Sequence, residues 1–167
     1  VIKSLHGMPK TIKITRGQVK LTEKEAKGEV FDADLPDGST IKIGVVDVPS
    51  FYADFDAIKR GDPAAKSTTV DVRKIIDAMI ENDKISGVII DLRSNGGGSL
   101  EEAISLSGLF IPSGPVVQVR KVGGHVDVRS DEDDGFAYKL PLAVVVNQLS
   151  ASASEIFSGA IQDYSRG

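Results

Sequence analysis

Apolar residues along the second half of this chain fall into two patterns that predict alternating strands and helices. Continuous apolar runs at residues 87–92 and 142–146 are typical of strands in a parallel sheet, and the first is expected to be buried on both faces. Apolar positions at helical spacing predict helices over residues 72–80, 100–109 and 153–164. The alternation predicts an α/β fold with a mainly parallel sheet.

The first 40 residues are more polar and follow a different pattern. Residues 11–15 alternate apolar and polar side chains, as an exposed antiparallel strand does. The Pro-Asp-Gly-Ser sequence at residues 36–39 predicts a turn, and a strand pattern resumes over residues 40–48. We therefore divide the chain into a linker and β segment, residues 1–40, and an α/β core, residues 41–167.

Two further segments complete the prediction for the core. Residues 51–63 carry three aromatic side chains without a clear period and predict a loop. Residues 116–120 predict a strand, and Val126 and Val128 beyond a Gly-Gly turn predict its hairpin partner.

Composition limits the class of protein but not its chemistry. The chain of 167 residues is 41% hydrophobic and 26% charged, which is typical of one globular domain. A net charge of −4 with scattered Lys and Arg gives no reason to expect a nucleic acid partner. The absence of cysteine excludes thiolate metal sites and a cysteine nucleophile. The acidic residues 131–134 predict a solvated loop, and we expect neither a metal nor a cofactor.

A serine-rich turn lies between the last predicted strand and the last predicted helix, with the sequence Ser-Ala-Ser-Ala-Ser-Glu at residues 150–155. A strand-to-helix turn is where α/β enzymes place a nucleophile, because the helix N-terminus supplies free N–H groups and partial positive charge. Ser152 also fits a purely structural role, as the N-cap of a capping box with Glu155. Ser150 and Ser154 are competing candidates for the nucleophile.

A run of glycines, Gly96 to Gly98, follows the 87–92 strand. Glycine is entropically unfavourable in regular structure, so the run indicates positive φ angles or the close approach of another group. A phosphate-binding loop lacks its usual Gly-Lys-Ser/Thr ending here, and a flexible loop is the plain alternative. An oxyanion hole made of one glycine N–H and the Ala153 N–H accounts for both turns together.

The residue that activates the serine is not evident from the chain itself. The two histidines are His6, in the N-terminal segment, and His125, in the predicted Gly-Gly turn, so a Ser-His-Asp triad has little support. A lysine with a lowered pKa is the alternative base, but no lysine follows Lys139.

Several long motifs resemble the tail-specific, or carboxy-terminal processing, serine proteases. They are the stretches at residues 88–98, 105–112, 150–157 and 162–164, which stand in the order and spacing of that family. The resemblance runs from about Gly44 to the last residue.

The resemblance implies particular roles for the residues of the two turns. Ser152 would be the nucleophile, and the N–H groups of Gly98 and Ala153 would hold the oxyanion. The base would be a lysine 25 positions after the serine, at position 177, beyond the final Gly167. An aspartate linked to activity in the family maps to Asp163, where we expect a structural or orienting role. The chain by itself is therefore expected to be inactive.

The family resemblance also implies a wider context. The fold would be the crotonase- and Clp-protease-like α/β spiral, with residues 1–40 following an absent PDZ domain. The partners would be proteins or peptides with exposed carboxyl-terminal tails, and the location would be the bacterial periplasm, with membrane association only of the parent protein. Two alternatives remain, a non-catalytic peptide-binding or assembly module and a crotonase-like acyl-CoA enzyme.

Overall fold

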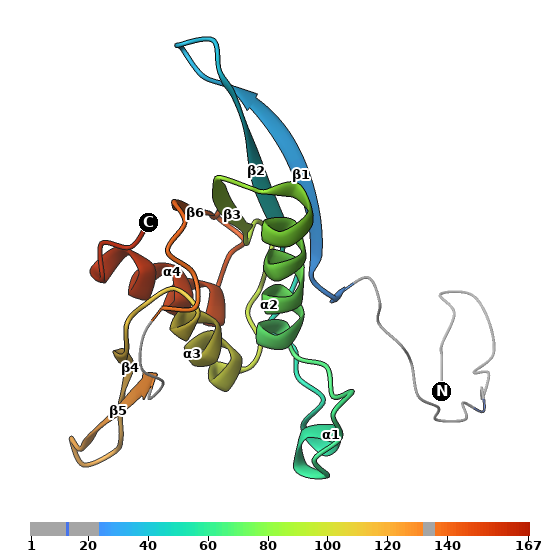
Figure 1. Ribbon diagram of the computed structural model, residues 1–167. Helices are drawn as coiled ribbons and strands as arrows, with labels where there is room; N and C mark the ends of the chain where they lie inside the picture. Colours follow the sequence, from blue (N-terminus) through green and yellow to red (C-terminus); the bar gives the residue numbers. More distant parts are fainter. Residues whose placement is uncertain (1–12, 14–23, 132–135) are drawn as a thin grey trace, which may run out of the picture.

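The computed structural model describes residues 13, 24–131 and 136–167 (Figure 1). The helices and strands occur in the order β1 (Lys27–Asp34), β2 (Thr40–Asp47), α1 (Phe55–Lys59), α2 (Thr68–Ala78), the π-helical turn η2 (Met79–Asp83), β3 (Gly87–Asp91), α3 (Leu100–Gly108), β4 (Gly114–Arg120), β5 (Val126–Asp131), β6 (Leu142–Val145) and α4 (Ala153–Asp163). The strands and long helices predicted within residues 40–164 are confirmed, with ends shifted by a few residues. The strand predicted at residues 11–15 lies outside the described residues.

The central sheet has the strand order β1-β2-β3-β6. Strands β2, β3 and β6 are parallel, which confirms the predicted parallel core. Strand β1 pairs antiparallel with β2 along its whole length, from Lys27 opposite Asp47 to Asp34 opposite Thr40. The sheet thus includes residues on both sides of position 40, and the domain division made there stays a prediction.

The core lies on one face of this sheet. Val46, Val88 and Ile90 are at most 3% exposed and belong to the core cluster that includes the helices. Their neighbours Val45 and Ile89 point to the opposite face and are only half-buried. The prediction that β3 is buried on both faces was therefore wrong for the face that carries Ile89, because the helices pack on the face that carries Val88 and Ile90.

Helix α2 and the η2 turn that follows it lie directly against the strands, and a Cβ atom added to Gly28 of β1 would overlap the Ile75 side chain of α2. A Cβ atom added to Gly44 of β2 would lie 2.7 Å from Sδ of Met79 and 3.0 Å from Cδ1 of Ile85, so glycine permits this close approach. After Ala78 the helix widens into η2 and ends at Lys84, which has a positive φ of 57°.

The far end of the β1–β2 hairpin, the short helix α1 and the β4–β5 hairpin all project from the body of the molecule (Figure 1). Residues 51–63, predicted to be a loop, contain the short helix α1, whose N-cap Asp54 accepts a hydrogen bond from the Ala57 N–H at 2.9 Å. Strands β4 and β5 form the predicted hairpin. Asp131, assigned to a solvated loop, is buried at the end of β5, and residues 132–134 lie outside the described residues. No described helix has both the length and the apolar character needed to span a bilayer.

Candidate functional site

The two turns singled out in the sequence lie side by side because they follow neighbouring parallel strands. Residues 92–98 follow β3 and residues 146–152 follow β6. The Ala151 N–H donates to the Asn95 carbonyl at 3.0 Å. The Ser94 N–H donates to Oδ1 of Asn147 at 2.9 Å. These bonds fix the serine turn and the glycine loop relative to each other.

Ser152 occupies a strained position at the start of α4. Its φ of 56° and ψ of −114° lie in a region that side-chain-bearing residues rarely adopt and that costs about 1–3 kcal/mol. The residue is exposed and is the N-cap of α4, as predicted. Ser152 and Glu155 form the predicted capping box, in which the Glu155 carboxylate accepts a hydrogen bond from the Ser152 backbone N–H at 2.6 Å. The hydroxyl thus stands exposed at the positive end of the helix.

The two competing serines are engaged in structural hydrogen bonds. The Ser150 hydroxyl donates to the Leu92 carbonyl at 2.8 Å and accepts from the Asn147 N–H at 2.9 Å. Ser154 is fully buried, and its hydroxyl donates to the Asn95 carbonyl at 3.0 Å. Among the described residues, the exposed Ser152 hydroxyl makes no such bond to Leu92, Asn95 or Asn147. The geometry therefore separates Ser152 from Ser150 and Ser154.

The glycine loop lies directly against Ser152. A Cβ atom on Gly97 would lie 2.7 Å from Cβ of Ser152 and 3.1 Å from the Ala153 nitrogen. Gly97 and Gly98 both have positive φ angles, 102° and 149°. A side chain at either position would be strained, and at Gly97 it would collide with the serine turn.

The N–H groups of Gly98 and Ala153 are the two candidate oxyanion donors. Phe51 donates its N–H to the Gly97 carbonyl at 3.0 Å, so the Gly98 N–H, in the same trans peptide group, points away from Phe51. The Ala153 N–H belongs to the first turn of α4, where helices leave such groups without a partner. Neither N–H has an acceptor among the described residues, whereas the Gly97 N–H is bound by Oδ1 of Asn95 at 2.8 Å. This favours Gly98 over Gly97 as a donor.

Asn95 is a structural residue of the site that the sequence analysis did not assign. It is fully buried, and its Nδ2 donates to the Val48 carbonyl at 2.7 Å, beyond the end of β2. Its Oδ1 binds Gly97, as in an Asx turn, and its carbonyl accepts bonds from Ala151 and Ser154. The Asn-Gly sequence after a strand was the available signal, since asparagine commonly makes such turns.

The other predicted site residues lie away from Ser152. Asp163 is exposed at the opposite end of α4, and eleven residues of helix correspond to about 16 Å along the axis. His125 is exposed in the turn between β4 and β5, on the projecting hairpin (Figure 1). His6 lies outside the described residues. Within the described part of the chain, no side chain acts as a base on the Ser152 hydroxyl.

A charged cluster borders the two turns at the carboxyl edge of the sheet. The Arg93 guanidinium and the Asp91 carboxylate form an ion pair at 2.5 Å, which holds the pKa of Asp91 below its ordinary value. Asp47 lies opposite Asp91 in the strand register. Burial, and then repulsion by Asp91, raises the pKa of Asp47. In the described residues, no group of three or more His, Cys, Asp or Glu side chains is arranged to hold a metal.

Comparison with known families and proteins points to one class. The model of peptidase family S41 matches residues 42–167. The chain is 41% identical over 161 residues to the tail-specific protease of Haemophilus influenzae, which covers 96% of this chain and 20% of that protein. It is 25% identical over 173 residues to a Staphylococcus aureus protein named "Probable CtpA-like serine protease", covering 99% of this chain and 32% of that protein. The chain thus spans a fifth to a third of the length of these relatives.

Solved structures share the fold. The photosystem II D1 C-terminal processing protease superimposes with a TM-score of 0.65 at 23% identity, over 85% of this chain and 34% of that chain. The structure of mature CPAF superimposes with a TM-score of 0.60 at 16% identity, over 84% of this chain and 39% of that chain. At these identities the likeness concerns the mixed α/β fold.

Proposed function

Because the chain belongs to peptidase family S41, we propose that it carries the nucleophile of a serine endopeptidase that processes or degrades proteins recognised by their carboxyl-terminal tails. One observation carries the proposal: Ser152 is exposed, its backbone has a positive φ, and it lies beside the glycine loop. That conformation is unfavourable for serine, and strain of this kind is concentrated at functional sites.

In the proposed reaction, the Ser152 Oγ attacks the scissile carbonyl carbon while a neutral lysine amine takes the hydroxyl proton. The oxyanion that forms accepts hydrogen bonds from the N–H groups of Gly98 and Ala153. The resulting lysine ammonium protonates the leaving amine as the C–N bond breaks, which leaves an acyl ester on Ser152. Water, deprotonated by the same lysine, then hydrolyses the ester. Each oxyanion donor is worth about 3–4 kcal/mol of transition-state stabilisation.

The base is proposed from the family resemblance alone, as a lysine 25 positions after Ser152. At that spacing it would stand at position 177, outside the 167 residues of this chain. We therefore propose that these residues alone do not turn over substrate. Asp163 keeps its proposed structural or orienting role, which agrees with its place at the far end of α4 from Ser152.

The wider context is also proposed from the resemblance. We propose a crotonase- and Clp-protease-like spiral for the complete core, a PDZ domain before residues 1–40, and a periplasmic location. An acyl-CoA enzyme of the crotonase type would also use a glycine-rich oxyanion hole. It would have no use for a strained serine at position 152, and a non-catalytic peptide-binding module would not need one either.

Cleavage of a peptide with an exposed carboxyl-terminal tail tests the proposal. The protein is extended beyond position 177 with its lysine, and turnover is compared with that of the 167-residue chain. Ser152→Ala should abolish turnover, whereas Ser105→Ala, at an exposed serine of α3, serves as the matched control. Robust turnover by the 167 residues alone would overturn the assignment of the base. Turnover by the extended Ser152→Ala variant would overturn the assignment of the nucleophile.

A further inference from the structure

The position of the Gly98 N–H depends on the segment that contains Phe51. Phe51 donates to the Gly97 carbonyl, and its own carbonyl accepts from the Ser99 N–H at 2.9 Å. Phe51 and Gly98 therefore form a parallel β-bridge. The Phe51 ring is 3% exposed and lies 6.4 Å from the Phe157 ring of α4, measured between centroids. Any displacement of Phe51 would carry the glycine loop with it.

Tyr52, the next residue, is held at both its backbone and its side chain. Its N–H donates to Oγ1 of Thr68 at 2.7 Å, and its carbonyl accepts from the Thr68 N–H at 2.9 Å. Its hydroxyl donates to Oδ2 of Asp71 at 2.6 Å and accepts from the Ala26 N–H at 3.1 Å. Tyr52 thus joins the first turn of α2 to the residue that precedes β1.

The elements that Tyr52 joins are themselves tied to the glycine loop. The Thr69 N–H of α2 donates at 2.8 Å to Oε2 of Glu102, a buried residue of α3. Helix α3 begins with the N-cap Ser99, immediately after Gly98. Lys66 and Glu25 add an ion pair at 2.6 Å between the approach to α2 and the approach to β1. The first turn of α2 is therefore the common support of Phe51 and of the start of α3.

We propose that Tyr52 is a positioning residue for the Gly98 N–H, acting through Phe51, an inference that rests on the proposed proteolytic function. Without its hydroxyl, Asp71 and the Ala26 N–H both lose a partner, and the residue adjoining the β-bridge is held less firmly. In this role Tyr52 contacts Ala26, Thr68 and Asp71 and not the substrate, so substrate binding should be kept. The oxyanion, which forms only in the transition state, would be held less well, so the loss should fall on kcat.

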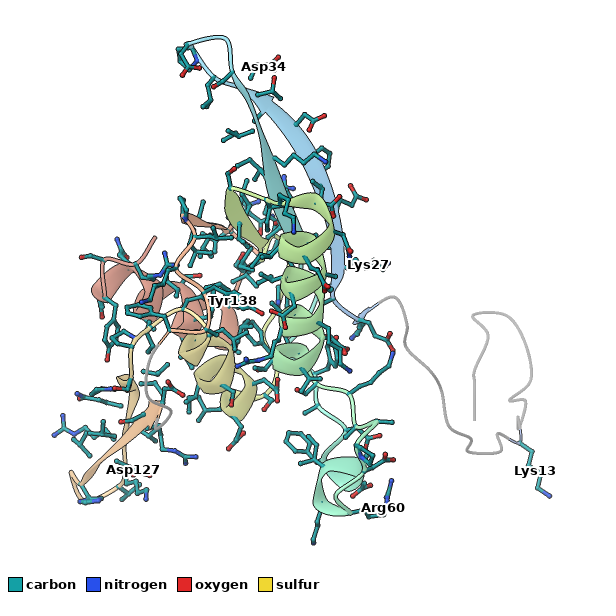
Figure 2. All side chains as sticks on the ribbon, in the orientation of Figure 1. Lys13, Lys27, Asp34, Arg60, Asp127 and Tyr138 are labelled. Atoms are coloured by element: carbon teal, nitrogen blue, oxygen red, sulfur yellow. The ribbon has the colours of Figure 1, made fainter. Side chains whose placement is uncertain are left out.

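The chain offers a matched control on the same helix. The Tyr138 hydroxyl donates to Oδ1 of Asp77 at 2.6 Å, also on α2. Burial raises the pKa of both tyrosines, so each hydroxyl remains a donor at neutral pH. The Tyr138 ring packs against Phe110, and its N–H donates to the Leu109 carbonyl at 3.0 Å. Figure 2 shows Tyr138 in the body of the molecule, where none of these contacts involves the glycine loop.

The experiment compares Tyr52→Phe with Tyr138→Phe in the protein extended beyond position 177. Both variants remove one hydroxyl from an aspartate of α2, so both should shift the urea unfolding midpoint in the same direction. We expect Tyr52→Phe alone to lower kcat for a tail peptide by about 10-fold with KM unchanged, a smaller loss than removal of a whole oxyanion donor. Equal kcat values in the two variants, or a change confined to KM, would overturn the inference.

A second pair of variants keeps the test decisive if Tyr52→Phe does not fold. Asp71→Asn retains an oxygen that can accept from the Tyr52 hydroxyl, whereas Asp71→Ala does not. We expect Asp71→Ala to lose more kcat than Asp71→Asn, and equal losses would count against the inference. Ser152→Ala is measured alongside. An active Ser152→Ala variant would reject the proposed function itself, and an inactive one leaves the tyrosine comparison to decide the inference alone.

Discussion

The two turns at the carboxyl edge of the sheet and the β4–β5 hairpin differ in where their polar side chains lie, which is mostly buried in the turns and exposed to solvent in the hairpin. In the turns, buried hydrogen bonds made by Asn95 and Ser154 and a partly buried one made by Ser150 hold the backbone in place. In the hairpin, the ion pair between Lys121 and Asp127 is solvent-exposed and 3.4 Å long. Figure 2 shows Asp127 on the arm that projects from the body.

This difference indicates that the backbone of the two turns is held in one conformation by its neighbours, whereas the tip of the hairpin is not. Both regions contain glycines with positive φ, but Gly97 and Gly98 lie against other groups, whereas Gly123 and Gly124 at the tip of the hairpin have nothing within 4 Å of an added Cβ atom. Within the described residues of the turns, the N–H groups of Gly98 and Ala153 lack partners beside the exposed Ser152, whereas their neighbours are bound. A rigid frame around a few unbound polar groups is the arrangement that preorganised catalysis requires. The hairpin has no such frame.

The largest expected effect is that of a methyl group at Gly98. A Cβ there would overlap the Phe51 carbonyl, and the φ of 149° disfavours any side chain. Gly98→Ala should therefore lower the free energy of unfolding by about 3 kcal/mol or more and reduce kcat at least 100-fold. The control is Gly123→Ala in the hairpin, where nothing lies within 4 Å and only backbone strain of about 1–2 kcal/mol applies. Equal losses of stability, measured by urea unfolding, would contradict the comparison.

Removal of the Asn95 side chain should have the next largest effect. Asn95→Ala leaves the Val48 carbonyl and the Gly97 N–H without their partners in a buried site. We expect a loss of about 2–4 kcal/mol in the free energy of unfolding. His125→Ala, in the exposed turn of the hairpin, should stay within about 0.5 kcal/mol of the starting protein. Chemical denaturation gives the free energy of unfolding of both variants. An Asn95→Ala variant as stable as His125→Ala would show that the hydrogen bonds of Asn95 are not needed to hold the two turns.

The strain at Ser152 predicts a smaller effect with an unusual sign. Alanine keeps the unfavourable φ of 56°, whereas glycine adopts it freely. Ser152→Gly should therefore be more stable than Ser152→Ala by about 1 kcal/mol, because glycine relieves the backbone strain. The sign is unusual because glycine in the middle of a helix is normally less stable than alanine. Thermal unfolding measures the difference, and a less stable glycine variant would argue against strain at this position.

The smallest effect concerns pH. The ion pair with Arg93 lowers the pKa of Asp91, so its stabilisation is present above the ordinary pKa of 3.8 and disappears as the pH falls through the lowered pKa. Asp91→Asn should cost up to about 1 kcal/mol at pH 6 and nothing at a pH well below 3.8. Asp47, whose pKa is raised, predicts the opposite sign, so Asp47→Asn should stabilise the protein at neutral pH. Unfolding midpoints measured across this pH range check both signs.

Much of this arrangement was predictable from the sequence. The apolar runs of β3 and β6 and the periodic residues of α2 and α4 predicted the sheet and the helices that cover it. Ser152 at the start of α4 was predicted as well, because a strand-to-helix turn leaves few choices for the N-cap. These features depend on local patterns, which the sequence shows directly.

Other features depend on contacts between distant residues and could not be predicted. The carbonyl acceptors of Ser150 and Ser154 come from Leu92 and Asn95, more than fifty positions earlier in the chain. The partial exposure of the β3 face that carries Ile89 likewise depends on where the helices pack. The apolar run would be the same whether helices covered one face of β3 or both. Hydrogen bonds of this kind, and not periodicity, separate Ser152 from its neighbouring serines.

The most direct test of the central claim is to locate the covalent adduct of a fluorophosphonate on the protein extended beyond position 177. Peptide mass spectrometry after proteolytic digestion identifies the modified residue. The account predicts a single adduct on Ser152, formed more slowly when Gly98 is replaced by alanine. An adduct on Ser150 or Ser154, or an unmodified Ser152 in a protein that cleaves tail peptides, would contradict it.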